Sequence, residues 1–177
     1  MALTEEEINL LKSYKDKAFI MNVLCELSYN QYTFYKNIIN IPLILINTAM
    51  TILNSIIEKS DDMKIPNIIL NSSTGLIIAF ISQYKIYEKI NDFKGLYMKF
   101  NKLSTEIDKK LITEHNEITI EEINHFIETY NNLVDSIDYP ISESIKKKVK
   151  KQFNDKYEFP SILSVDIVVC ENKACCV

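Results

Sequence analysis

The sequence predicts an all-α protein with a two-helix transmembrane hairpin, and three observations support this fold class. Residues 37–57 and residues 65–84 carry no charged side chain, whereas five of the seven residues between them are charged. A bilayer core about 30 Å thick is crossed by a helix of about 20 apolar residues. The chain has only two glycines, whereas sandwiches and barrels require many turns. We therefore expect a hairpin with long juxtamembrane helices and a small cytoplasmic helical bundle.

The N-terminal segment is predicted to form one long helix, from about residue 5 to residue 35. Thr4 and Glu7 have the spacing of a capping box, in which each side chain bonds the amide of the other residue. Apolar residues recur behind it at three- and four-residue steps; they are Ile8, Leu11, Ala18, Met21, Leu24 or Cys25, and Tyr32. This helix is expected to run into the first membrane helix, with a kink at Pro42, because proline removes an amide hydrogen bond.

The second membrane helix is predicted over residues 65–84, with Pro66 at its start, where a missing amide costs little. The helix is expected to continue after Tyr84 to about residue 112. Its apolar stripe resembles a coiled-coil seam that requires a partner, and the N-terminal helix is the expected one. The stripe consists of Ile86, Ile90, Phe93, Tyr97, Phe100, Leu103, Ile107 and Leu111.

Two shorter helices are expected after this stripe. Thr119 and Glu122 form a second capping box, which predicts a helix over residues 120–137. Pro140 ends it, because the residue before proline avoids the helical conformation. A last helix is predicted over about residues 142–156.

The last predicted helix carries a cluster of five lysines: Lys146, Lys147, Lys148, Lys150 and Lys151. Such a cluster is typical of a solvated helix face. The alternative is contact with anionic cytoplasmic lipid, which contributes about 1 kcal/mol per lysine near the surface. We divide the chain into a two-transmembrane domain, residues 1–152, and a C-terminal tail, residues 153–177.

The distribution of lysine predicts the orientation of the hairpin. Seven lysines lie within about 20 residues of the spans on the side of the termini, and two lie in the turn. Because lysine-rich segments stay inside, both termini are expected to be cytoplasmic. Aromatic residues also gather where both spans meet that side, as in interfacial belts; they are Tyr29, Tyr32, Phe34, Tyr35, Tyr84 and Tyr87. The alternative is a buried hairpin in a soluble helical bundle.

Polar side chains inside the two spans are the candidate functional residues. They share one face of each helix: Asn40, Asn47 and Asn54 on the first span, and Asn67, Asn71 and Thr74 on the second. An amide in lipid is costly unless it is paired or hydrated. These residues therefore either hydrogen-bond between helices, at about 0.6–2 kcal/mol each, or line a water-filled pore built by several hairpins. Gly75 and Ala79 form a small-xxx-small pair that lets another helix approach closely.

The sequence gives no basis for an enzyme, and we expect no catalytic residue, metal site or cofactor. It lacks the Walker A, GxGxxG, HExxH and GxSxG motifs. His115 and His125 are the only histidines, and the four cysteines lack the spacing of a zinc site. A net charge of −4 argues against nucleic acid as a partner.

The order of the predicted helices and several short stretches resemble a known family. The stretches are residues 93–100 continuing to 103–107, and residues 130–133 with 139–142. They are similar to the SMODS- and SLOG-associating two-transmembrane effector domains, called SLATT, over about residues 8–152. The juxtamembrane arginines usual in that family are lysines here.

The resemblance implies a membrane-embedded effector that oligomerises with its own copies, with pore formation as one mode of action, in nucleotide-linked conflict or cell-suicide systems. It brings no catalytic residues. A separate sensor or nucleotide-signalling partner would supply the trigger, because no such domain is fused to this chain. The alternatives are a non-conducting membrane scaffold and a soluble helical regulatory bundle.

Overall fold

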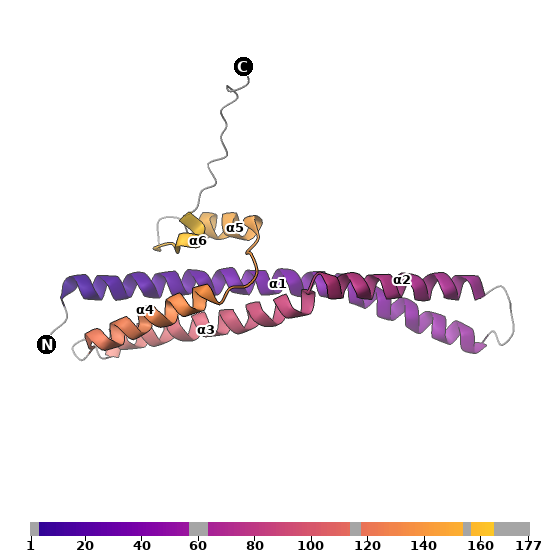
Figure 1. Cartoon of the computed structure of the whole chain (residues 1–177), viewed down its shortest axis with the longest axis horizontal. Coiled ribbons are helices and arrows are strands. Elements are labelled where there is room, and N and C mark those ends of the chain that lie inside the picture. The colour runs from indigo at the N-terminus through magenta and orange to yellow at the C-terminus, as the bar shows by residue number, and fades with distance from the viewer. Residues whose placement is uncertain (1–3, 57–63, 114–117, 154–156, 165–177) are drawn as a thin grey trace, which may run out of the picture. The chain divides into compact units, whose positions relative to one another are not determined.

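The computed structural model describes residues 4–56, 64–113, 118–153 and 157–164, and every regular element in these ranges is an α-helix. The helices are α1 (Glu5–Ile56), α2 (Lys64–Gln83), α3 (Ile86–Thr113), α4 (Ile120–Asp135), α5 (Glu143–Phe153) and α6 (Ser161–Ser164) (Figure 1). The prediction of an all-α fold is confirmed for this part of the chain.

The contacts between helices divide the chain into two compact units. The terminal unit comprises Met1–Leu24 and Tyr97–Val177, and the central unit comprises Cys25–Leu96. Helices α1 and α3 each contribute residues to both units.

Two helices begin with the capping boxes that the sequence predicts. The Thr4 hydroxyl accepts the amide of Glu7 at 3.3 Å, and the Glu7 carboxylate accepts the amide of Thr4 at 2.7 Å. At the start of α4, Thr119 and Glu122 form the same reciprocal pair. The ammonium group of Lys110 on α3 also donates to the Glu122 carboxylate at 2.9 Å. These bonds, that of Lys110 first, lower the pKa of Glu122, so the carboxylate stays ionised while it caps α4 and ties α4 to α3.

Helix α1 continues for 52 residues through Pro42, so the N-terminal helix runs into the first apolar segment. Helices α2 and α3, by contrast, are separate, and the expectation of one continuous helix is wrong. Lys85 has a φ of 51°, in the left-handed region that costs a residue with a side chain about 1–2 kcal/mol. Its amide bonds the carbonyl of Ser82 at 3.0 Å, and its own carbonyl accepts the amide of Lys89 at 3.0 Å, where α3 begins. The break could not be predicted from the sequence because no glycine or proline marks it.

The core of the terminal unit lies between the N-terminal part of α1 and helices α3 and α4 (Figure 1). Phe100 on α3 is fully buried, as is Leu11 on α1. Tyr130 of α4 lies between these helices: its ring meets that of Tyr14 edge-on at 5.3 Å and that of Phe100 at 6.0 Å, between centroids. Lys15 of α1 pairs with Asp108 of α3 at 3.1 Å. In this unit the apolar stripe of α3 therefore packs against α1 of the same chain.

Helix α5 and the segment after it also pack on α1. Phe19 of α1 contacts the rings of Phe153 and Tyr157, with centroids 5.8 Å and 5.2 Å away. Pro160 and Leu163 are buried, so part of the predicted tail belongs to the terminal unit. Residues 165–177, which include three of the cysteines and the apolar run from Ile167 to Cys170, lie outside the described residues.

Candidate functional site

The first apolar segment of α1 lies against α2 in the central unit, and two side-chain hydrogen bonds mark this seam. The Thr74 hydroxyl donates to the amide oxygen of Asn47 at 3.5 Å. Farther along, the Asn40 amide nitrogen donates to the hydroxyl of Tyr87, at the start of α3, at 2.8 Å. Asn40, which comes before Asn47, pairs with Tyr87, which comes after Thr74. Helix α1 therefore runs antiparallel to the segment that returns beside it.

The least exposed side chains of the two apolar segments face this seam. They recur at three- and four-residue steps and are half-buried, except for Ile81, which is buried: Ile39, Asn40, Leu43, Asn47 and Met50 on α1, and Asn67, Leu70, Thr74, Ile77 and Ile81 on α2. Two of the three amides of the first segment, Asn40 and Asn47, are therefore on the inside of the pair. The third, Asn54, lies on α1, but its side chain is outside the described part of the structure.

Large apolar side chains point outward from the same two segments. Their exposed fractions run from 41% to 68%, and they are Ile38, Ile41, Ile44, Leu45, Ile46, Ile52 and Leu53 on α1, and Ile65, Ile68, Ile69, Leu76, Ile78 and Phe80 on α2. Monomeric soluble proteins rarely expose a contiguous apolar surface of this kind. The pair thus turns the Asn40 and Asn47 amides inward and a set of large hydrocarbon side chains outward, whereas a soluble helical hairpin would bury such a set.

Two helices are long and apolar enough to cross a membrane, judged by length and composition. One lies within Glu5–Leu53 and the other within Ile65–Thr113. A core helix of a soluble protein would pass the same test but would be mostly buried, whereas only 0% and 6% of these apolar windows are buried. The exposure of the windows therefore separates them from ordinary core helices.

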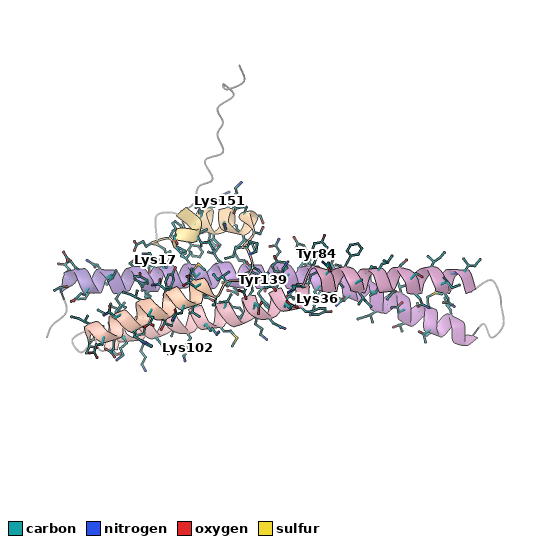
Figure 2. All side chains as sticks on the ribbon, in the orientation of Figure 1. Lys17, Lys36, Tyr84, Lys102, Tyr139 and Lys151 are labelled. Atoms are coloured by element: carbon teal, nitrogen blue, oxygen red, sulfur yellow. The ribbon has the colours of Figure 1, made fainter. Side chains whose placement is uncertain are left out.

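Aromatic and basic side chains gather at one end of the seam. Figure 2 places Lys36 of α1 and Tyr84, just after α2, at the same end of the apolar segments. Tyr84 is 61% exposed. The Tyr32 ring stacks on Phe93 with centroids 5.8 Å apart, and the ammonium group of Lys89 lies 5.4 Å from the centroid of the same ring. Tyrosine rings flanked by lysine are typical of the interface between hydrocarbon and headgroups.

Asn71, Gly75 and Ala79 lie outside the seam. All three are exposed, although Asn71 was expected to share a helix face with Thr74. The Asn71 amide has no hydrogen-bonding partner among the described residues, and a Cβ atom added at Gly75 would meet no heavy atom within 4 Å. Within the described residues of the central unit, no further helix covers this part of α2.

The candidate packing residues of α3 are buried or half-buried, and the candidate lysines of α5 lie on faces away from the core. Phe93 and Phe100 are buried and Tyr97 is half-buried. On α5, Ile145 and Val149 face the core, which leaves the lysines on the other faces. Lys147, Lys148 and Lys151 are exposed, Lys150 is half-buried, and Lys146 pairs with Glu143 at 2.8 Å.

The described residues contain no cluster of three histidine, cysteine, aspartate or glutamate side chains that could hold a metal ion. Burial raises the pKa of the Cys25 thiol to about 12, which keeps the sulfur neutral and a poor nucleophile near pH 7. His125 is exposed, and His115 lies outside the described residues.

The role of Tyr87 could not be predicted from the sequence, in which this residue belongs only to an aromatic belt. The hydrogen bond from Asn40 joins residues 47 positions apart, and no local pattern signals such a pairing. Tyr87 can be paired with Asn40 only once it is known that the chain returns beside α1.

We expect the Asn40–Tyr87 bond to stabilise the pair by about 0.6–2 kcal/mol. A double-mutant cycle with Asn40→Leu and Tyr87→Phe, read from thermal unfolding in detergent, should give a coupling energy in this range. Tyr84→Phe, which removes a hydroxyl from an exposed ring nearby, should show no coupling to Asn40→Leu. Additive effects of Asn40→Leu and Tyr87→Phe would contradict the bond.

Comparison with known protein families, curated proteins and solved structures found no match. The function is therefore inferred from the geometry of the seam and from the sequence resemblance described above.

Proposed function

We propose that this chain is a two-span membrane protein with both termini in the cytoplasm, which acts as an effector by oligomerising in the membrane. One observation carries the proposal: the apolar segments of α1 and α2 turn large hydrocarbon side chains outward and the Asn40 and Asn47 amides inward. In water such a surface would drive aggregation. In lipid it is the favoured arrangement, because polar groups there must find partners within the protein.

The effector role is supported by the resemblance to the SLATT domains. In this proposal a separate sensor or nucleotide-signalling partner triggers the assembly, and the chain itself carries out no chemical reaction and binds no nucleic acid. Two helices from one chain cannot enclose a pore, so conduction would require several copies.

A second candidate function, a non-conducting membrane scaffold, is favoured by the bonds of the seam amides. Asn40 and Asn47 each use a polar atom in a contact within the same chain, as expected of side chains that join helices. The third alternative, a soluble regulatory bundle, is disfavoured by the exposure of both apolar windows.

The topology predicts where a cysteine in the turn can be labelled. A Ser60→Cys variant should react with a membrane-impermeant maleimide added to intact cells, because lysine bias places the turn outside. The unsubstituted chain is the control: Cys170, Cys175 and Cys176 should react only after the membrane is opened. Labelling of Ser60→Cys that also requires permeabilisation would invert the proposed topology.

Reconstitution into lipid vesicles distinguishes a conducting effector from a non-conducting scaffold. Purified protein reconstituted into lipid vesicles should release an entrapped dye if the assembly forms a pore, and the leak should rise with the amount of oligomer. A protein that assembles but never leaks, with candidate triggers added, would leave the scaffold as the function.

Asn47→Leu then tests whether the seam amides line the path of the ions. Because Asn47 pairs with Thr74 inside one chain, we expect the substitution to lower the stability of the helix pair by about 1 kcal/mol. The leak should then fall only in proportion to the loss of oligomer. Leak and oligomer are measured on the same samples by dye release and cross-linking. A leak abolished at unchanged assembly would instead identify Asn47 as part of a water-filled constriction, since an apolar ring there would exclude water.

A further inference from the structure

One side of the central unit carries small and polar residues among the large apolar ones. On α2 these residues recur at three- and four-residue steps, and α1 adds two threonines. We call this surface the polar face; it consists of Thr48, Thr51, Asn71, Gly75, Ala79 and Ser82, all of them exposed.

The register of the seam brings the two halves of the polar face together. Asn47 lies opposite Thr74. Thr48 and Gly75 each follow a seam residue by one position, which is a rotation of about 100° around its helix. Both helices are right-handed and they run antiparallel, so this step turns toward the same side of the pair on each. Thr51 and Asn71 fall on that side as well, and the two helices therefore form one continuous face.

The opposite side of the pair has a different character. Residues that precede a seam residue by one position point to this opposite side, as Ile46 does on α1 and Phe80 on α2. Leu53 of α1 falls on this side as well, and all three side chains are large and exposed. Among the described residues of this side, Ser73 is polar, and its hydroxyl donates to the carbonyl of Ile69 in its own helix at 2.8 Å. That side is suited to hydrocarbon chains without any protein partner.

On the polar face the threonine hydroxyls are satisfied in the same way, but the Asn71 amide is not. Thr48 and Thr51 donate to carbonyls of α1 at 2.8 Å, as serine and threonine do in membrane helices. Asn71 has no such bond among the described residues, although asparagine in a helix is able to bond its own backbone. An unpaired amide facing lipid is costly, so a hydrogen-bonding partner on a neighbouring molecule would stabilise Asn71.

We propose that the polar face is the surface through which one chain contacts a second copy of itself in the membrane. This inference rests on the proposed function, because it assumes that lipid surrounds the pair. An amide both donates and accepts hydrogen bonds, so Asn71 is complementary to Asn71, Thr48 or Thr51 of another copy. Gly75 and Ala79 allow the backbones to approach, and the space beside Gly75 is open.

Cysteine cross-linking in native membranes tests the proposal with neighbouring residues. In a chain whose Cys170, Cys175 and Cys176 are replaced by serine, Ala79→Cys should form disulfide-linked dimers on mild oxidation, whereas Phe80→Cys should not. Both positions are exposed, so neither change alters the core. Cross-linking of Phe80→Cys at or above the level of Ala79→Cys would overturn the proposal.

Asn71→Leu and Ser73→Leu form a second matched pair, two residues apart on α2. Asn71→Leu should lower the yield of the Ala79→Cys dimer by about 3- to 30-fold, the range that corresponds to one interhelical polar contact. Ser73→Leu should leave the yield unchanged. Equal yields from the two variants would show that Asn71 makes no contact between chains.

Retention in the membrane after an alkaline carbonate wash separates the two levels of inference. A chain that is washed out of the membrane contradicts the proposed function. A chain that is retained but gives no dimer from Ala79→Cys contradicts the polar face alone.

Discussion

A Phe100→Asp substitution is expected to unfold the terminal unit. The Phe100 ring is fully buried and lies 6.0 Å from the ring of Tyr130. Loss of a buried phenylalanine side chain alone costs about 3–5 kcal/mol, and a carboxylate without a partner in the core adds several more. Since a domain of this size is stable by about 5–15 kcal/mol, little or no stability should remain. Far-UV circular dichroism during heating, and proteolysis of the purified protein in detergent, would measure the loss.

Met98→Asp is the matched control for this substitution. Met98 lies on the same helix, two residues earlier, and is 56% exposed. A charge introduced there should change the free energy of unfolding by no more than about 0.5 kcal/mol. If Phe100→Asp and Met98→Asp unfolded at the same temperature, the apolar stripe of α3 would not form the core of the terminal unit.

Two lysines in the middle of the first apolar segment should remove the protein from the membrane. Ile44 and Leu45 are 62% and 65% exposed, and on a soluble protein Ile44→Lys with Leu45→Lys would be nearly neutral. In a bilayer each lysine near the centre of a span costs about 2.5–3.5 kcal/mol, so the pair should prevent stable insertion of this segment. The fraction of protein that resists a carbonate wash measures the effect.

The control places the same charges on exposed apolar residues of the terminal unit. Leu10 and Ile112 are 42% and 74% exposed. Leu10→Lys with Ile112→Lys should leave the membrane-bound fraction unchanged, because these residues lie outside both spans. A soluble, folded protein carrying lysines at 44 and 45, with the wild type soluble as well, would instead establish the soluble bundle.

Local interactions explain which features could be predicted from the sequence alone. The capping boxes join residues three apart, as in Thr4 with Glu7, and the helices follow from apolar steps of three and four residues. The length and lack of charge of the two apolar segments are properties of composition. None of these features depends on where the chain goes next, so the all-α class, the start of α4 and the two candidate spans could be predicted without a structure.

The tertiary structure decided where α2 ends and which polar residues meet. Lys85 adopts a left-handed conformation although its side chain disfavours it. Ile90 and Phe93 are buried in α3, and the burial of two such side chains contributes about 1.5–3 kcal/mol each, which exceeds the cost of about 1–2 kcal/mol at Lys85.

The seven-residue spacing showed that Asn40 and Asn47 share a face, but it could not show what that face meets. Their partners lie 47 and 27 residues away, and the pairing depends on the register of antiparallel helices. The same register leaves Asn71 outside the seam, although it is only three residues from Thr74. Sequence alone therefore determined the all-α class and which residues share a helix face, whereas only the packing of distant segments decided where α2 ends, which amides are paired within the chain and that Asn71 faces outward.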